Sequence, residues 1–160
     1  MTTTTAYQAN SAIKMDYQIK PLTEDFVDSV SEIERECFST PFSKNDILSY
    51  LKNDIWHFFA CFSNDKLLGY ISFTLIIDEI SICNVAVSES HRGKGVGSAL
   101  VGYLLDFARK NQVKSLFLEV RESNINAISL YKKFGFEKTG LSKNHYSSPT
   151  ENAILMGLEL

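Results

Sequence analysis

A glycine-rich segment at residues 92–98 has the composition of an anion-binding turn. It follows an apolar run at residues 85–87 and leads into apolar residues at helical spacing, so it joins a strand to a helix. Glycine lets the backbone approach a ligand closely, and the N–H groups at the start of a helix carry the positive end of its dipole. We therefore predict that residues 92–98 bind phosphate groups.

Glu119 is a second candidate for chemistry, because it lies within the apolar run 116–120. A carboxylate on a buried strand loses its hydration unless a cation, hydrogen-bond donors or a water-filled cleft compensates. Arg121, two residues later and on the same face of a strand, would form a structural ion pair with it. In the functional interpretation, partial burial raises the pKa of Glu119 toward neutral pH and the carboxylate acts as a general base. The residues alone leave both interpretations open.

The elements that must position these residues follow from the hydrophobic periodicity. It predicts about seven strands and four helices, arranged as an α+β sheet with helices on both faces. The strands are expected at residues 16–22, 56–62, 67–77, 80–87 and 115–120, from Phe136 onward and at 154–160, and the helices after Thr23, after Ser43, at 96–110 and after Ser123 or Asn124. Strands 56–62 and 67–77 are expected to be antiparallel neighbours, whereas 80–87 and 115–120 are parallel across a β-α-β crossover.

Residues with known capping preferences mark the helix ends. Thr23 and a capping box formed by Ser43 and Asp46 are expected to start the first two helices. Asn111 and Gly135 are expected to end the last two helices in the left-handed conformation. The apolar residues of the first helix form one stripe, so we expect its solvent side to carry Glu32, Glu34 and Glu36.

Length and charge limit the class of protein. The chain has 160 residues and a formal net charge of −3, and we expect a disordered leader at residues 1–15 and a single domain at 16–160. The acidic balance argues against nucleic-acid binding, and the longest apolar run, residues 70–77, is far shorter than the ~20 residues of a membrane span. The start of the chain lacks the features of a secretion signal, so a cytoplasmic location is expected.

The cysteines and histidines do not suggest a metal site. Cys37, Cys61 and Cys83 are odd in number and lie in apolar surroundings, so we expect buried free thiols. The three histidines are scattered without the spacing of metal ligands, and no metal ion is expected.

Two groups of residues resemble one protein family. Residues 85–87 followed by Arg92, Gly95 and Gly97 match the Q/R-x-x-G-x-G/A signature with which GNAT acetyltransferases hold the pyrophosphate of acetyl coenzyme A. The second half of the chain is similar to bacterial RimI-type ribosomal-protein-alanine N-acetyltransferases at Leu118, Glu119, Val120, Arg121, Ser123, Asn124, Ala127, Leu130, Tyr131, Phe134, Gly135, Phe136, Asn144, Tyr146 and residues 153–156. The resemblance covers residues 16–160 and is strongest from 80 to 136.

The resemblance implies both a fold and an activity. The implied fold is a GNAT-like α/β three-layer arrangement, with a mixed, mostly antiparallel seven-stranded sheet, four flanking helices and a central parallel strand pair. The implied enzyme transfers acetyl from acetyl coenzyme A to the α-amino group of a protein N-terminus, by direct attack in a ternary complex. The implied partner is a small-subunit ribosomal protein with an N-terminal alanine, and we expect a monomer or weak dimer.

In such an enzyme, Glu119 is the general base that deprotonates the incoming ammonium group, and Tyr131 is the acid that protonates the departing thiolate. The residues expected to bind acetyl coenzyme A are Val85, Ala86, Val87, Arg92, Gly93, Lys94, Gly95, Val96, Gly97, Ser98 and Asn124. Substrate contacts are expected from Phe42, His145 and Tyr146. Taken without the resemblance, Tyr131 is an aromatic core residue and Asn124 is a helix cap.

Three positions depart from the RimI-type pattern and bear on the substrate rather than on acetyl transfer. His145 stands where many members have a second tyrosine, Phe42 where tryptophan is common and Asn152 where aspartate is frequent. Two other functions therefore remain open: a GNAT enzyme that acts on a small-molecule amine or a lysine side chain, and a coenzyme A-binding module without catalysis. A dinucleotide site is not expected, because the glycine turn lacks G-x-G-x-x-G.

Overall fold

From residue 16 onward, strands and helices follow one another in the order that the periodicity predicts. The computed structural model describes residues 5–8 and 16–160. Over these residues the strands are β1 (Thr5–Gln8), β2 (Asp16–Pro21), β3 (Trp56–Ser63), β4 (Lys66–Ile76), β5 (Glu79–Val87), β6 (Ser115–Arg121), β7 (Glu137–Tyr146) and β8 (Glu151–Glu159). The α-helices are α1 (Val27–Cys37), α2 (Lys44–Leu51), α3 (Val96–Lys110) and α4 (Ile125–Lys133), and short 3-10 turns lie at Glu24–Phe26 and Glu89–His91.

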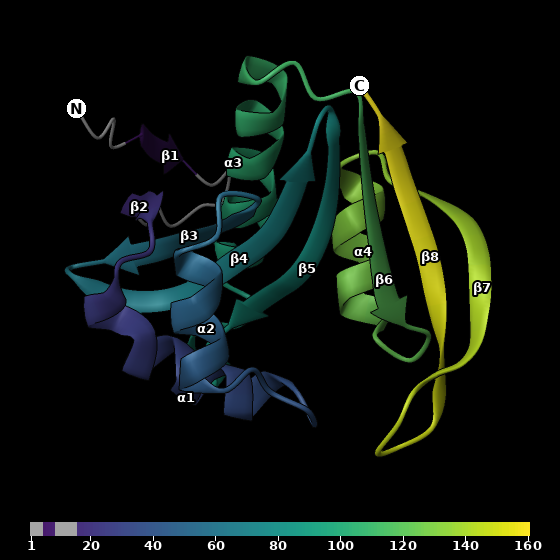
Figure 1. Ribbon diagram of the computed structural model, residues 1–160, viewed down its shortest axis with the longest axis horizontal. Helices are drawn as coiled ribbons and strands as arrows, with labels where there is room; N and C mark the ends of the chain where they lie inside the picture. The colour runs from purple at the N-terminus through teal and green to yellow at the C-terminus, as the bar shows by residue number, and fades with distance from the viewer. Residues whose placement is uncertain (1–4, 9–15) are drawn as a thin grey trace.

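One mixed sheet runs through the part of the chain that the structure describes, with the order β1-β2-β3-β4-β5-β6-β8-β7 (Figure 1). Neighbouring strands are antiparallel except β5 and β6, which are parallel across the α3 crossover. The seven predicted strands correspond to β2–β8, and the antiparallel β3–β4 hairpin and the parallel β5–β6 pair are confirmed.

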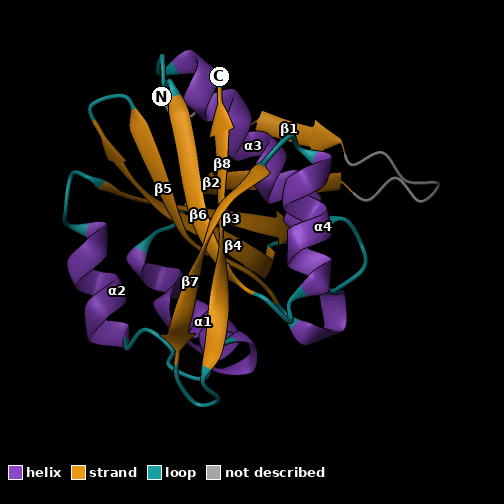
Figure 2. Cartoon of the chain, turned by 90° about the vertical axis from the view of Figure 1, so that its right-hand side faces the viewer, coloured by secondary structure: helices purple, strands orange, loops and turns teal. Residues whose placement is uncertain are grey.

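Helices cover both faces of the sheet and give the protein two cores (Figure 2). On one face, Val30 and Ile33 of α1 pack with Ile47 of α2 against the β3–β4 hairpin. On the other face, Leu100 and Leu104 belong to a larger core formed by α3, α4 and the sheet. Both faces of β3 and β4 are therefore apolar, and this explains why their sequences read as continuous rather than alternating hydrophobic runs.

The N-terminal segment differs from the expectation of a disordered leader. Thr5–Gln8 forms β1, which pairs antiparallel with β2 through Thr5↔Ile19 and Gln8↔Asp16. These residues are thus an eighth strand rather than part of a disordered segment. Residues 1–4 and 9–15, on which the rest of that prediction falls, lie outside the described residues.

Two of the predicted helix ends, at Thr23 and Asn111, need correction. Ser43 and Asp46 form both hydrogen bonds of the capping box, and Gly135 has a φ of 96°, as predicted. Thr23 instead precedes a 3-10 turn and its side chain caps nothing. Asn111 is not left-handed: its φ is −98°, and its side-chain amide donates to the carbonyl of residue 107 (2.8 Å). The left-handed residue is Gln112, with φ 57°, and the N–H groups of residues 112 and 113 close the end of α3 by donating to the carbonyls of residues 109 and 108 (3.2 and 2.9 Å).

The parallel strands β5 and β6 pair at one end only. Their register consists of Glu79↔Ser115, Ile80↔Leu116 and Ser81↔Phe117, after which the strands separate (Figure 1). A bulge lies in β5 just beyond this point, since Ile82 and Asn84 pair with consecutive residues of β4 while Cys83 is skipped. A bulge bends a strand and increases its twist. It therefore turns the rest of β5 away from β6.

Candidate active site

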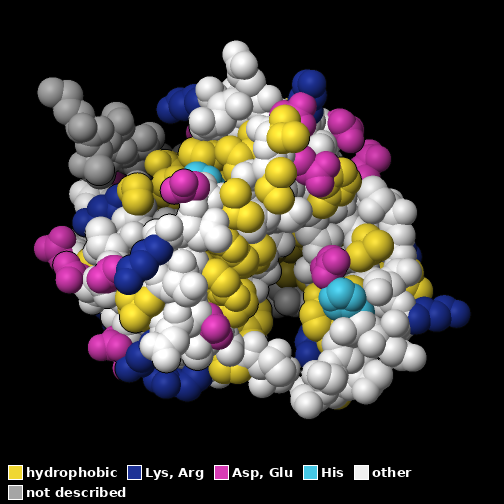
Figure 3. Space-filling view, viewed as in Figure 1, with side chains coloured by type: hydrophobic (Ala, Val, Ile, Leu, Met, Phe, Trp, Pro, Cys, Tyr) yellow, Lys and Arg dark blue, Asp and Glu magenta, His cyan; other side chains and the backbone are white. Residues whose placement is uncertain are grey.

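A cleft of about 690 Å³ occupies the space where β5 and β6 separate. Its walls come from the α1–α2 loop, β5, β6, α4, β7 and β8, and Figure 3 shows this hollow between the two halves of the molecule, with hydrophobic side chains in its walls. Six of the predicted site residues line it: Phe42, Val85, Glu119, Asn124, Tyr131 and Tyr146. The structure thus brings together residues that lie more than 100 positions apart in the sequence.

The β5 edge at Val85 and Val87 faces away from β4. The N–H of Ser88 donates to the carbonyl of Leu68 (2.8 Å), so the hydrogen-bonded pairs of the antiparallel ladder continue at Ala86. The N–H and C=O groups of Val85 and Val87 belong to the alternate residues of β5, so they point away from β4, toward the side where β6 has separated. The Val87 carbonyl already accepts from the thiol of Cys37 and from the Arg92 side chain, which leaves Val85 as the better placed to pair with an extended ligand.

The predicted phosphate turn leads into the N-terminus of α3. Gly93 and Gly95 have φ values of 73° and 83°, a backbone conformation that favours glycine. Gly95 is the N-cap of α3, so the next N–H groups have no partner within the helix. A Cβ at Gly97 would lie 3.2 Å from Leu130, so glycine here lets α3 and α4 pack closely. The hydroxyl of Tyr17 on β2 donates to the Lys94 carbonyl, and this hydrogen bond connects the turn to β2.

Arg92, expected to add charge at this turn, is directed elsewhere. Its guanidinium contacts the Val87 carbonyl (3.3 Å) and the sulfur of Cys37 (3.4 Å). The side chain therefore braces the turn against β5 and α1. The backbone of the turn, rather than this side chain, offers the donors that suit an anion.

Glu119 is exposed in the cleft rather than buried. Its side chain is 53% exposed, so the burial on which the sequence-based expectation rested is absent. Its partner is His145, whose Nε2 lies 2.7 Å from Oε2 of Glu119. Arg121, the partner considered from sequence, instead forms an ion pair with Glu151 (3.5 Å).

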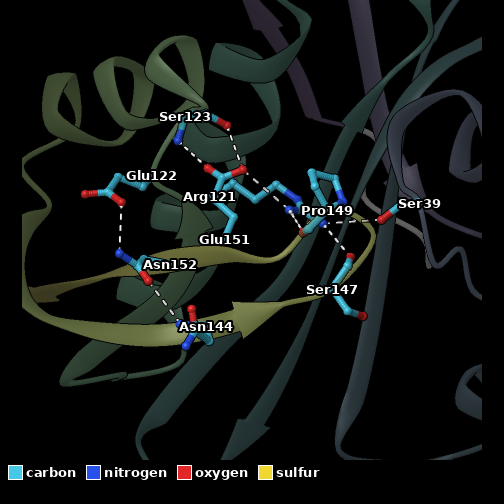
Figure 4. Close-up of polar contacts among 9 residues, drawn as sticks. All are labelled: Ser39, Arg121, Glu122, Ser123, Asn144, Ser147, Pro149, Glu151 and Asn152. Carbon is cyan, nitrogen blue, oxygen red and sulfur yellow. Dashed lines mark hydrogen bonds and ion pairs between the residues drawn. The ribbon is translucent and has the colours of Figure 1, made fainter.

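Arg121 connects two loops that border the cleft (Figure 4). Its guanidinium donates to the backbone carbonyls of Ser147 (3.2 Å) and Pro149 (3.1 Å) in the β7–β8 turn, and to the hydroxyl of Ser39 (3.3 Å) in the α1–α2 loop. It also lies over the ring of Tyr146, 4.4 Å from the centroid. Arg121 thus ties together the loop that contains Phe42 and the hairpin that contains His145 and Tyr146.

Tyr131 is a core residue that also reaches the cleft. Its side chain is buried and packs edge-on against Phe136, with ring centroids 5.7 Å apart. Burial raises the pKa of Tyr131, so the phenol stays protonated at neutral pH and retains a proton to donate. Asn124, at the start of the same helix, accepts from the N–H of Ala127 (3.2 Å) and is the predicted N-cap.

Comparison with known proteins identifies the family. Residues 24–136 match the model of the acetyltransferase (GNAT) family. The chain belongs to the GNAT acetyltransferases. It is 32% identical to the [ribosomal protein bS18]-alanine N-acetyltransferase of Escherichia coli K12 over 130 residues, covering 80% of this chain and 87% of the relative. It is 33% identical to the Haemophilus influenzae protein of that name over 135 residues, with 81% and 89% covered.

Solved structures agree with the sequence relatives. The crystal structure of the ribosomal-protein-S18-alanine N-acetyltransferase from Escherichia coli superposes with a TM-score of 0.83 at 30% identity, covering 89% of this chain and 93% of the other. Arabidopsis thaliana NAA60 in complex with a bisubstrate analogue shares the fold, with a TM-score of 0.82 at 15% identity. This chain is therefore a RimI-type GNAT and an acetyl-transferring enzyme.

The GNAT site includes a buried carboxylate, Glu34, which the periodicity assigned to the solvent side of α1. Its side chain is fully buried and accepts from the N–H of Phe42 (2.9 Å) and from the amide of Asn84 (2.8 Å). Burial raises the pKa of Glu34, while the two hydrogen bonds oppose that rise. Glu34 therefore joins α1, the start of α2 and the bulged part of β5. Asn84 lies 50 positions from Glu34 and Phe42 lies in the loop beyond α1, so the periodicity of α1 identifies neither partner.

Replacing Glu34 by Gln is expected to destabilise the GNAT domain by about 1–3 kcal/mol, the cost of leaving a buried donor unsatisfied. Glutamine has one acceptor oxygen for two donors, so either Phe42 N–H or the Asn84 amide loses its partner. Urea unfolding measures the difference. Glu32→Gln, on the exposed side of α1, is the matched control and should stay within about 0.5 kcal/mol of wild type. Equal stabilities for the two variants would contradict the assigned role of Glu34.

The three cysteines are free, but only Cys61 is buried as predicted. Cys37 is half-buried and Cys83 is exposed in the cleft, because the bulge turns it out of the β4–β5 ladder. Although part of its surface is exposed, the surrounding protein raises the pKa of the Cys83 thiol to about 11. A thiol with this pKa is a poor nucleophile at neutral pH.

Within the described residues, no cluster of three or more His, Cys, Asp or Glu side chains is arranged to hold a metal ion. In the same part of the chain, no helix is long and apolar enough to span a membrane.

Proposed function

We propose that this GNAT enzyme acetylates the α-amino group of a protein N-terminus, using acetyl coenzyme A, and that its substrate is a ribosomal protein beginning with alanine. The observation that carries the proposal is the convergence of Glu119 and Tyr131 on one cleft, beside the open edge of β5. A carboxylate and a protonated phenol are the two groups that amide formation from an ammonium ion and a thioester requires. The names of the relatives support the substrate assignment.

The residues of the cleft and turn fit the co-substrate. The α3 N-terminus with Gly93 and Gly95 offers unpaired N–H groups to the pyrophosphate. The edge of β5 at Val85 offers an N–H and a carbonyl to the amide groups of the pantetheine arm, as an added strand would. Acetyl coenzyme A supplies the acetyl group as a thioester, so the protein itself needs no nucleophile.

In the proposed mechanism the side chains of the cleft move protons and orient the amine. Glu119 accepts a proton from the ammonium group, directly or through one water, so that the nitrogen lone pair becomes available. Tyr131 donates its phenolic proton to the departing sulfur, and the second proton that the nitrogen loses from the tetrahedral intermediate restores the phenol. A backbone N–H near Val85 stabilises the negative charge that develops on the carbonyl oxygen.

Two loops bound the entrance for the peptide. Phe42 lies in an aromatic cluster with Tyr50 and Trp56 on one side, and Tyr146 lies beneath Arg121 on the other. The side chains of the first peptide residues contact these walls in the proposed complex. Selectivity thus comes from segments outside the acetyl-transfer centre.

A peptide panel tests the function. Purified enzyme is incubated with acetyl coenzyme A and peptides that begin with Ala, Ser or other residues, and the products are located by mass spectrometry. We expect acetylation at the α-amino group and preference for alanine. Two results would refute the proposal in favour of another amine substrate. One is acetylation of internal lysines, and the other is turnover of free polyamines at a rate that does not depend on whether the peptide N-terminus is blocked. Tight binding of acetyl coenzyme A without turnover of any amine would indicate a binding module.

A further inference from the structure

A bulge in β7 controls the direction of His145. Ser142 pairs with Ala153 and Tyr146 pairs with Glu151, so residues 143–145 lie opposite the single residue Asn152. Asn144, in the middle of the bulge, has a φ of 52°. Bulges re-aim side chains that the regular alternation of a strand would direct elsewhere. Here the bulge precedes the residue that contacts Glu119.

Asn152 holds this bulge with both ends of its amide (Figure 4). Its Oδ1 accepts from the backbone N–H of Asn144 (3.0 Å), and its Nδ2 donates to the carboxylate of Glu122 (3.2 Å). An aspartate at this position would have no N–H to offer and would place a second negative charge beside Glu122. The asparagine therefore suits a bulge that is anchored to the end of β6.

The two nitrogens of His145 face different surroundings. Nε2 contacts Oε2 of Glu119 at 2.7 Å, whereas Nδ1 lies 3.3 Å from the hydroxyl of Ser142 on the exposed side of β7. The His145 side chain is 33% exposed, and the residue lies outside the cleft lining to which Glu119 belongs. The ring thus lies between a carboxylate in the cleft and the hydroxyl of Ser142, which is outside the cleft lining.

We propose that His145 receives the substrate proton from Glu119 and passes it to bulk water. The inference rests on the proposed acetylation of a protonated amine. An ammonium group and a thioester yield an amide, a thiol and one proton, so each turnover must release one proton to solvent. The Glu119–His145 pair offers a route for it that avoids the bound substrates.

The step balances in protons at each atom. The ammonium group gives one proton to a carboxylate oxygen of Glu119. In the tautomer that carries hydrogen on Nδ1, the bare Nε2 of His145 takes this proton from Glu119, and the resulting imidazolium releases the Nδ1 proton to water beside Ser142. The ring is then left with hydrogen on Nε2, which donates to the ionised carboxylate of Glu119, and exchange with solvent moves this hydrogen to Nδ1 once Glu119 is protonated again. Glu119 is left ionised for the next substrate.

The other titratable and charged groups near His145 are already engaged. Tyr146 packs edge-on against the imidazole, with ring centroids 4.9 Å apart, and lies beneath Arg121. Glu151 of β8 is bound by Arg121 and by the backbone and hydroxyl of Ser123. Burial raises the pKa of Tyr146, which keeps that phenol neutral, and Glu119 is the carboxylate that contacts the ring.

Rescue by added imidazole tests the relay. With a peptide that wild type acetylates, His145→Ala is expected to lower kcat about 10-fold and to leave the KM for the peptide unchanged. The expected loss is smaller than the roughly 10²–10⁴-fold that a directly acting acid or base contributes, because His145 acts through Glu119. Imidazole in the buffer should restore kcat in His145→Ala, but not in the double variant that also carries Glu119→Gln. The rescue should increase with pH as the fraction of neutral imidazole rises. Lys143→Ala, on the same bulge, is the matched control and should retain wild-type kcat.

The outcomes separate the relay from the proposed function. Each of three results for His145→Ala would overturn the relay. They are an unchanged kcat, a rise in the KM for the peptide alone, and a loss of kcat that imidazole does not restore although the circular dichroism of the variant matches wild type. These results leave α-amine acetylation intact, because wild type remains active in the same assay. A wild-type enzyme that acetylates no α-amine would refute the proposed function and the relay together.

Discussion

Replacing Glu119 by Gln is expected to lower kcat at neutral pH by about 10²-fold or more, in the range that general acid–base catalysis contributes. Glutamine preserves the shape of the side chain but cannot accept a proton from the ammonium group. Glu119 lies on β6 across the cleft from the edge of β5, so the affinity for acetyl coenzyme A should change little. Steady-state kinetics with saturating peptide measures kcat, and titration calorimetry measures the binding of acetyl coenzyme A.

Glu137→Gln is the matched control for this experiment, because Glu137 is exposed at the start of β7 and does not line the cleft. It should leave kcat and stability unchanged. If Glu119→Gln also kept the wild-type rate, Glu119 would be a structural partner of His145 and the base would have to be sought elsewhere. A loss of acetyl coenzyme A affinity in Glu119→Gln would point in the same direction.

Replacing Tyr131 by Phe is expected to reduce kcat by about 10²-fold, the lower end of the range for a positioned proton donor. Phenylalanine keeps the ring that packs against Phe136 and removes only the hydroxyl. The variant should therefore fold normally and unfold at nearly the wild-type temperature. Pre-steady-state release of the thiol, followed with a thiol reagent, reports on the step at which the proton is needed.

Tyr103→Phe is the matched control for Tyr131→Phe. Tyr103, on α3, is partly buried and packs beside Phe59 of β3. Burial raises the pKa of Tyr103, as it raises that of Tyr131, but Tyr103 does not line the cleft. Its replacement should leave kcat unchanged. An equal rate for wild type and Tyr131→Phe would make Tyr131 a packing residue and remove the acid from the mechanism.

Much of the fold follows from local chemistry. The capping box at Ser43 and Asp46, and the left-handed Gly135, depend on residues close in sequence, and both are found where the pattern predicts them. Asn111 shows the limit, since α3 does end in a left-handed residue, but one position later than predicted, at Gln112. β1 was missed because a short polar segment carries no periodicity, and its pairing with β2 is a contact between separate segments.

The site was predictable in composition but not in environment. Glu119 and Tyr131 were recognised through residues near them in sequence, and the structure puts both on one cleft. The exposure of Glu119 depends on the separation of β5 from β6, and its pairing with His145 depends on the β7 bulge. Glu34 was assigned to solvent because its burial depends on Asn84, 50 positions away. Side-chain partners set by strand register and bulges cannot be obtained from periodicity.

The limited pairing of β5 with β6 makes the sheet two mechanical units, β1–β5 and β6–β8, joined by three residue pairs at one end. Arg121 connects the same units at the other end through a single long hydrogen bond to the hydroxyl of Ser39 (3.3 Å), which breaks more easily than a ladder. A ligand strand laid along Val85 fills the missing part of the sheet interior. In the proposed complex, the co-substrate is therefore a structural component as well as a reactant, and we expect its departure after each turnover to loosen the connection between the two half-sheets that line the peptide site.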